Sequence, residues 1–188
     1  AAQEGQTDAV YEACGDRLCA VMESRPRFGQ LVDLMAWAAD RFAAIPADRS
    51  QPRPLVGVVG ENYVRHHRFA NNDLVRHLER LGAEVTVASF PEYHFYMNWF
   101  RMGEAWTRRS PRQWLANYLQ DRVQRRIHAR LARPFWSLLG PIREPETTAL
   151  LDLAAPFLPT SFDAGETVLT IAKTIEFSHQ GCQGVVNV

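Results

Sequence analysis

The sequence predicts an α/β fold built on a small parallel sheet, and three features of the 188-residue chain lead to this prediction. A continuous apolar run at residues 55–59 is typical of a strand that is buried on both faces, as in parallel sheets. A helical pattern at residues 74–81 and a second strand pattern at residues 84–88 follow it, and the three have the combined length of a right-handed βαβ crossover. A third apolar run, at residues 185–188, follows a helical pattern at residues 166–179. If this third strand pairs with the first strand on the side opposite to the second strand, the strand order is 2-1-3, as in a flavodoxin-like (Rossmann-like) sheet.

The N-terminal region has the pattern of a helical hairpin. One helical pattern starts near residues 7–8 and ends before Pro26, and a second amphipathic pattern covers residues 28–45. Residues 46–54 contain three prolines and few apolar side chains, which is typical of a linker. The predicted organisation is a hairpin at residues 1–45, a linker at residues 46–54 and an α/β domain at residues 55–188.

The connections within the α/β domain also carry signals. Asn71 or Asn72 is the expected cap of the helix at residues 74–81, and Gly82 is expected to end it in the left-handed conformation. Residues 91–158 are predicted to be an all-helical insertion whose aromatic side chains fill a core. A sheet of about three strands is small for this fold and the chain stops on the third strand, so we expect a fragment truncated at the C-terminal end of its domain.

Composition and charge exclude several classes of protein. The 46% apolar content is that of a globular chain, and no run of about 18 apolar residues predicts a membrane span. Because 21 acidic residues balance 21 basic ones, we expect no dedicated nucleic-acid binding. An odd number of cysteines, three, fits free thiols in a reducing compartment, and the N-terminal residues have no targeting pattern. The predicted location is the cytoplasm.

The charges are unevenly distributed along the chain. Residues 108–133 contain eight arginines and one acidic residue, whereas residues 1–24 contain five acidic residues and one arginine. Apolar residues recur at every fourth position from Leu115 to Leu131, which predicts one amphipathic helix with a solvated basic face. The alternative is that the basic face docks on an acidic partner or attracts a phosphate-bearing substrate such as an acyl-CoA. The side chains proposed for docking are Arg122, Arg125, Arg126 and Arg130.

The predicted topology points to one candidate binding site. Ligands of open parallel sheets bind beyond the carboxyl ends of the strands, where the strand order reverses, and here that is the loop after Gly60. The candidate cofactor-binding residues of this crevice are Glu61, Asn62, Tyr63, Arg65, Asn71 and Asn72. Arg65 and the helix start near Asn72 could hold an anion. The structural alternative is that an Asn caps the helix, Glu61 pairs with an arginine and the His66–His67 pair lies in solvent.

Other kinds of site are not indicated. Residues 57–60 lack the third glycine of a dinucleotide-binding loop, and no Gly-Lys-Ser/Thr motif occurs. Cys14 and Cys19 are about 140° apart around one predicted helix, and Cys182 is expected at the opposite end of its strand from the crevice. Adjacent histidines with no third ligand at a recognisable spacing do not form a metal motif. We therefore expect three free thiols, no metal site and no catalytic residue.

Two stretches of the sequence carry a family resemblance. The first consists of residues 56–65, 69–75 and 78–85, and the second runs from Gly165 through Phe177 to Val188. Together they resemble the 2-hydroxyglutaryl-CoA dehydratase D-component-like domain. The closer similarity is to the version found in long acyl-CoA dehydratase activases, also called CoA-substrate-specific enzyme activases, and in double-cubane-cluster reductases.

The resemblance implies a function for the parent protein. It implies an oxygen-sensitive iron–sulfur system of anaerobic metabolism, in which an ATPase drives low-potential electron transfer to an acyl-CoA dehydratase or other redox partner. The family places a cluster-ligand cysteine in a segment that would follow Val188, and no cysteine of this chain matches a ligand position. We therefore expect an iron–sulfur cluster in the full-length protein and none in this inactive piece. The alternatives are a structural module that docks through its Arg-rich helix and a flavodoxin-like binder of a phosphorylated small molecule.

Overall fold

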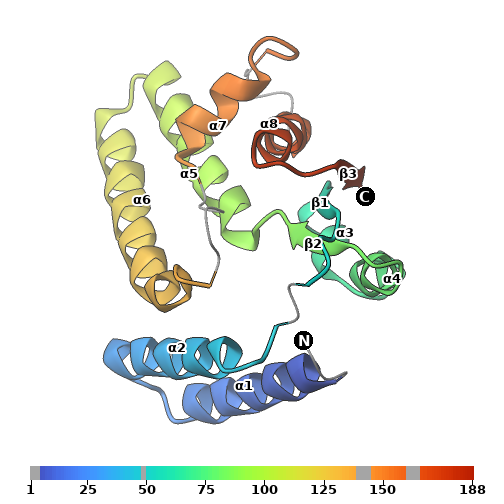
Figure 1. Cartoon of the computed structure of the whole chain (residues 1–188). Coiled ribbons are helices and arrows are strands. Elements are labelled where there is room, and N and C mark those ends of the chain that lie inside the picture. The colour runs from blue at the N-terminus through green and yellow to red at the C-terminus, as the bar shows by residue number, and fades with distance from the viewer. Residues whose placement is uncertain (1–4, 48–49, 139–144, 160–165) are drawn as a thin grey trace. The chain divides into compact units, whose positions relative to one another are not determined.

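The computed structural model describes residues 5–47, 50–138, 145–159 and 166–188, and the chain divides into two compact units. Unit 1 comprises residues 1–52 and 123–143, and unit 2 comprises residues 53–122 and 144–188. Figure 1 shows the elements of both units. Residues 123–138, which the sequence analysis placed within the α/β domain, group with the N-terminal helices in unit 1.

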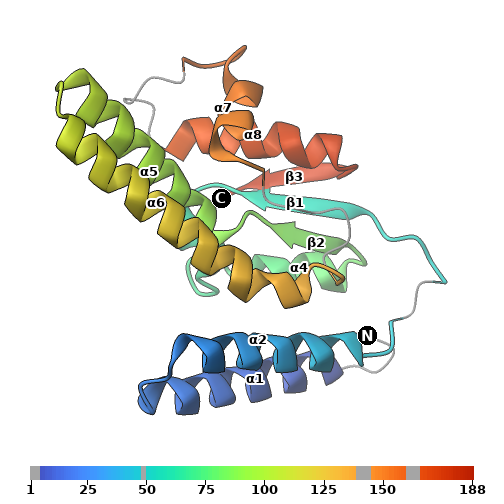
Figure 2. The ribbon, with the colours of Figure 1, turned by 90° about the vertical axis from the view of Figure 1, so that its left-hand side faces the viewer.

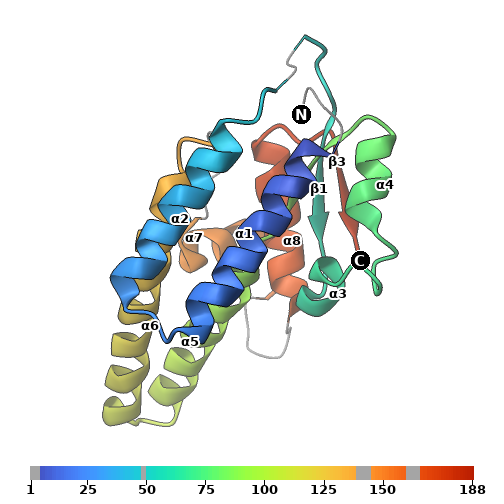
Figure 3. The same cartoon turned by 90° about the horizontal axis from the view of Figure 1, so that it is seen from below.

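Unit 1 is helical. Helices α1 (Gln6–Glu23) and α2 (Phe28–Ala43) run side by side, which confirms the predicted N-terminal hairpin (Figures 1 and 3). Trp37 of α2 lies 4.2 Å from the guanidinium carbon of Arg17, so a cation–π contact joins the two helices. The 3₁₀ helix η1 (Arg133–Phe135) packs against α2.

Unit 2 contains the predicted sheet. Strands β1 (Leu55–Val59), β2 (Glu84–Val87) and β3 (Gly184–Asn187) are parallel in the order β2-β1-β3, as Figure 2 shows. The α/β fold with order 2-1-3 is therefore confirmed. The last three residues of β1 are buried because the central strand has a neighbour on each side and helices over its faces.

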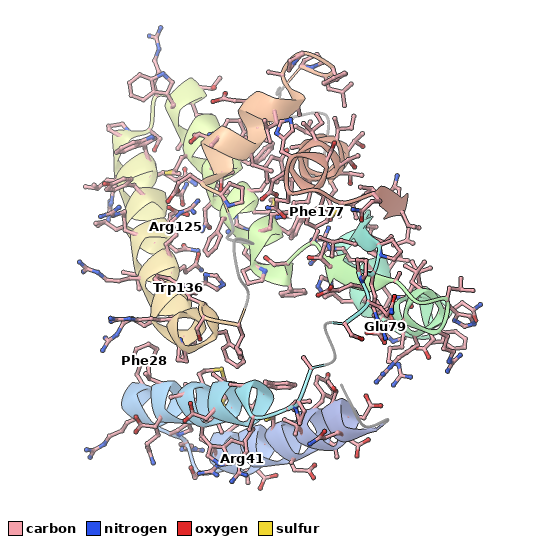
Figure 4. The ribbon with its side chains drawn as sticks, viewed as in Figure 1. Phe28, Arg41, Glu79, Arg125, Trp136 and Phe177 are labelled. Atoms are coloured by element: carbon pink, nitrogen blue, oxygen red, sulfur yellow. The ribbon has the colours of Figure 1, made fainter. Side chains whose placement is uncertain are left out.

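Helices cover the two faces of the sheet. Helix α8 (Glu166–His179) packs on β1 and β3, whereas α4 (Leu74–Arg80) packs on β2 from the opposite face (Figure 2). Phe177 projects from α8 toward the strands (Figure 4) and is only 1% exposed. Its ring lies where a side chain at Gly57 would be, so glycine at this position of β1 allows α8 to approach the sheet closely.

The described part of the insertion after β2 is mainly helical, as predicted. It contains α5 (Phe90–Thr107), the first half of α6 (Pro111–Ala132) and α7 (Thr147–Ala154). One apolar core joins α5, α7 and α8, and its buried members are Tyr96, Leu150, Leu151, Ala154, Val168, Leu169 and Ala172. None of the helices in the described part of the chain has the length and hydrophobicity to cross a membrane.

The burial of α6 differs from the prediction. Its apolar ladder was expected to face inward, but Leu115, Leu119 and Val123 are 51–57% exposed and Ile127 is 42% exposed. The fully buried residue of α6 is Asp121, whose Oδ1 accepts a hydrogen bond from Nδ2 of Asn98 at 3.1 Å. A periodic pattern indicates which side chains share a face but does not determine which face the rest of the protein covers. The predicted basic face is exposed at Arg112, Arg122 and Arg126, but the prediction that the apolar ladder faces inward is wrong.

The connection from β1 to β2 contains one element that the pattern did not predict. Helix α3 (Asn62–His66) directly follows the strand, and α4 then begins at Leu74. Asn71 accepts a hydrogen bond from the N–H of Leu74 at 3.3 Å, so it satisfies a backbone donor at the start of α4. Asn72 is exposed with a φ of 53°, and Gly82 has the predicted left-handed conformation with a φ of 93°.

Candidate functional site

The carboxyl end of β1 meets the C-terminal end of the chain. The N–H of Val188 donates to the carbonyl oxygen of Val59 at 3.1 Å, and the N–H of Glu61 donates to the carbonyl oxygen of Val188 at 3.0 Å. Gly60, with a φ of 119°, makes the turn between these bonds. Figure 3 shows the C-terminus beside α3. The loop after β1 and the end of β3 therefore form one continuous edge, which we call the carboxyl edge.

Arg65 organises this edge from within. It is 5% exposed, and its guanidinium donates to the carbonyl oxygen of Gly60 at 2.8 Å, to Oδ1 of Asn62 at 3.1 Å and to the carbonyl oxygen of Ser89 at 3.1 Å. These bonds join the residues that follow β1 to those that follow β2. These contacts give Arg65 a positioning role in the loop, and its suggested binding of an anion stays a prediction.

The other polar candidates also hold the loop in place. The side chain of Glu61 accepts from the N–H of Val64 at 2.8 Å and thereby caps α3. Backbone hydrogen bonds from Tyr63 and Val64 lower the pKa of Glu61 below its ordinary value of 4.5 because they favour the carboxylate. Asn71 donates from Nδ2 to the carbonyl oxygens of Val64 and Arg65, each at 3.0 Å. The sequence-based alternative paired Glu61 with an arginine, whereas its hydrogen bond here is to the backbone.

Aromatic rings surround the polar framework of the carboxyl edge. Tyr63 is 61% exposed, Phe69 is 91% exposed and Phe90 is 51% exposed. Ring contacts connect them to exposed histidines, with Tyr63 stacked on His67 at 4.8 Å and Phe90 lying 5.7 Å from His66. We call this set the aromatic rim, and its members are Tyr63, His66, His67, Phe69, Phe90 and His94. Exposed apolar rings gathered in one place often mark a binding surface.

Phe90 and His94 were not among the predicted site residues, although a signal was present. Both residues lie in the first turns of α5, the helix that follows β2. Because the carboxyl ends of parallel strands lie at the same edge of a sheet, the residues that follow the second strand should approach those that follow the first. His94 lies 5.1 Å from Phe90, measured between ring centroids, which extends the rim onto α5.

A cavity of about 560 Å³ lies elsewhere in unit 2, at the turn between α5 and α6. Trp106, Arg109 and Trp114 are among the residues that line it. No residue predicted for the crevice and no residue of the aromatic rim belongs to this lining. The cavity therefore serves as an internal comparison for experiments on the carboxyl edge.

The carboxyl edge does not fit an iron–sulfur cluster. Cysteine thiolates form the usual bonds to such clusters, and the cysteine that belongs to unit 2 is Cys182. Cys182 lies next to Gln183, whose N–H donates to the carbonyl oxygen of Leu55, so it is at the amino end of β1, about 13 Å of strand from the carboxyl edge. Among the residues that the structure describes, no group of three or more histidine, cysteine or carboxylate side chains could hold a metal ion.

A buried ionic cluster lies between α5 and α8. The ammonium group of Lys173, which is 3% exposed, lies 3.0 Å from a carboxylate oxygen of Glu92 and 2.8 Å from one of Glu176. Both carboxylates are themselves nearly buried. Because these charges are removed from water, removing one partner would leave an uncompensated buried charge between the two helices.

The chain was compared with protein-family models, with curated proteins and with solved structures, and none of them matches it. The resemblance to the dehydratase D-component-like domain therefore stays a prediction. The two stretches that carry the resemblance meet at the carboxyl edge, where the N–H of Asn62 donates to a carboxylate oxygen of Glu166 at 3.0 Å and that of Glu61 donates to Val188.

Proposed function

We propose that unit 2 is a ligand-binding domain of an iron–sulfur activase or reductase related to the 2-hydroxyacyl-CoA dehydratases. In this proposal the aromatic rim binds an acyl-CoA, and the chain itself performs no chemical step. The observation that carries the proposal is the carboxyl edge, where two stretches more than 100 residues apart are joined by the bond from Asn62 to Glu166. Edges of this kind are the usual ligand sites of open parallel sheets.

The chemistry of the rim favours a ligand with both planar and apolar parts. Tyr63, Phe69 and Phe90 offer ring faces on which an adenine base can stack, and such stacking contributes about 1–3 kcal/mol for each base. The polar framework beneath holds these rings in place, because Arg65 and Asn71 fix the loop through five hydrogen bonds to backbone and side-chain oxygens. A preformed surface binds its ligand with less loss of conformational entropy.

Titration with a 2-hydroxyacyl-CoA tests the proposal. We expect saturable binding, which Tyr63→Ala and Phe90→Ala each weaken about tenfold because each removes one stacking face. Trp106→Ala is the matched control, since Trp106 is 76% exposed and lines the cavity at the α5–α6 turn. Absence of binding, or binding that depends on Trp106 but not on the rim, would contradict the proposal.

The electron-transfer part of the proposal rests on the sequence resemblance. It assigns the cluster to cysteines outside this chain, a redox protein such as an acyl-CoA dehydratase as the partner, and the reducing cytoplasm as the location. Anaerobic reconstitution of the chain with iron and sulfide should therefore leave it colourless and without bound cluster. A stable brown protein whose visible absorbance is lost on replacing Cys14, Cys19 or Cys182 by Ser would contradict this assignment.

A further inference from the structure

Helix α6 presents a face to solvent that is both apolar and basic. Leu115, Leu119 and Val123 are each more than half exposed. Exposed apolar side chains are usually scattered singly over a protein surface, whereas these three lie on one side of the same helix. At 100° per residue, arginines alternate with these apolar side chains around the same side of the helix. We call this the α6 outer face, and its members are Arg112, Leu115, Leu119, Arg122, Val123, Arg126 and Ile127.

Helix α1 presents the opposite charge. None of its 18 residues is buried, and Tyr11, Leu18 and Met22 are 72%, 38% and 53% exposed on one line along the helix. Three exposed carboxylates, Glu12, Asp16 and Glu23, form a second line about 120° around the helix from the first. We call these six side chains the α1 outer face.

Both faces have the features of surfaces that are normally covered. Most of the stability of a protein helix comes from packing its apolar face rather than from intrinsic propensity, and no residue of α1 is buried. In the described part of the chain, no salt bridge is formed by Arg112, Arg122 or Arg126, nor by the carboxylates of the α1 outer face. The charges of both faces are thus available to a partner.

We propose that the α1 outer face of one copy of this chain docks on the α6 outer face of a second copy. The α1 outer face carries three carboxylates and the α6 outer face three arginines, so the two faces attract each other while like faces repel. The helices are about 27 Å and about 33 Å long, which permits contact over several turns. Because each copy carries both faces, the contact is made twice in a two-fold dimer. The acidic partner expected from the sequence is, in this proposal, the chain itself.

Sedimentation analysis of the full chain at several concentrations tests for self-association. We expect a monomer–dimer equilibrium that weakens when salt rises from about 0.1 M to about 1 M, because the Debye length then falls from about 10 Å to about 3 Å. A protein that stays monomeric at high concentration and low salt would overturn the proposal. So would a dimer whose dissociation constant does not respond to salt.

Charge reversal in two variants makes the test specific. The first variant carries Glu12→Arg and Glu23→Arg, and the second carries Arg122→Glu and Arg126→Glu. Each alone should raise the dimer dissociation constant about tenfold or more, because like charges then face each other in both contacts. A mixture of the two should form a heterodimer, since every reversed face then meets a complementary one.

The mixing experiment separates docking from damage to the fold. A misfolded variant would not regain association when it is mixed with the other one. Arg80→Glu on α4 is the control, because Arg80 is exposed and belongs to neither outer face, and it should leave the dissociation constant unchanged. Failure of the mixture to associate, or equal weakening by Arg80→Glu, would overturn the assignment of the two faces.

Discussion

The backbone of Gly60 lies directly against the backbone of Val188. A Cβ atom built on Gly60 would overlap the carbonyl oxygen of Val188 and would lie 2.7 Å from its nitrogen. The same carbonyl accepts the hydrogen bond from Glu61, so the close approach and the positive φ of Gly60 serve one junction. This junction brings the loop that carries the aromatic rim to the end of β3.

Gly60→Ala should therefore destabilise unit 2 strongly. Alanine adds the steric cost of a left-handed φ and a collision with backbone atoms that cannot rotate away, so we expect a loss of at least about 2 kcal/mol in the free energy of unfolding. Urea unfolding measures this loss. Gly15→Ala on α1 is the control, because that position is helical with open space around it, and it should gain about 0.5–1 kcal/mol. Equal effects of the two substitutions would argue against the junction.

Arg65→Met should also lower stability, by about 3 kcal/mol. The substitution removes a buried guanidinium and leaves the carbonyl oxygens of Gly60 and Ser89 without a donor that they have in the native protein. Arg68→Met provides the comparison, since the side chain of Arg68 is 76% exposed and its pair with Asp73 lies at the surface. We expect this control to change the unfolding free energy by less than about 0.5 kcal/mol. A small effect of Arg65→Met would show that the arginine does not organise the edge.

Lys173→Met tests the buried ionic cluster. It leaves Glu92 and Glu176 without the ammonium group that pairs with both, and removing one partner of a buried ion pair costs about 3–5 kcal/mol. Adding Glu92→Gln and Glu176→Gln to the same chain should recover most of this loss, because no unpaired buried charge then remains. Chemical denaturation of the three forms measures the difference. If the triple variant is no more stable than Lys173→Met, charge pairing is not the cause.

Cys182 should react slowly with iodoacetamide. Burial raises the pKa of its thiol above the ordinary value of 9.0, and the nearby carboxylate of Glu176 raises it further. A higher pKa leaves less thiolate at a given pH, and the thiolate is the reactive form. Mass spectrometry of labelled peptides should find modification of Cys182 several-fold slower than that of the exposed Cys19 at neutral pH, with a rate that increases up to pH values above 9.0. Faster labelling of Cys182 would contradict the predicted thiol environment.

The sheet was predictable because its central strand is a short apolar run with a clear boundary. Valines at alternate positions mark the second strand, at residues 84–87, and Gly82 ends the helix between the two strands where a left-handed residue is needed. Helix α8 begins and ends at the residues that its pattern indicated. The order 2-1-3 then follows from right-handed crossovers and the placement of β3 beside β1.

Other features depend on contacts that a sequence pattern does not contain. Helix α3 has five residues and is defined by the cap that Glu61 supplies, which is too short for a periodic signal. The orientation of α6 depends on the buried hydrogen bond between Asn98 and Asp121, so polar rather than apolar side chains face inward. The predicted site residues lie at the carboxyl edge, but the aromatic rim also includes Phe90, whose proximity to His66 depends on the sheet.

Mapping an acyl-CoA on the isotope-labelled chain by NMR tests the central claim most directly. In a titration with a 2-hydroxyacyl-CoA, the account predicts that chemical-shift changes concentrate on the aromatic rim, led by Tyr63, Phe69 and Phe90. Residues around Trp106 and Trp114, which line the cavity at the α5–α6 turn, should remain unchanged. Shift changes centred on that cavity, or a spectrum unaffected by the ligand, would contradict the claim that the carboxyl edge is the binding site.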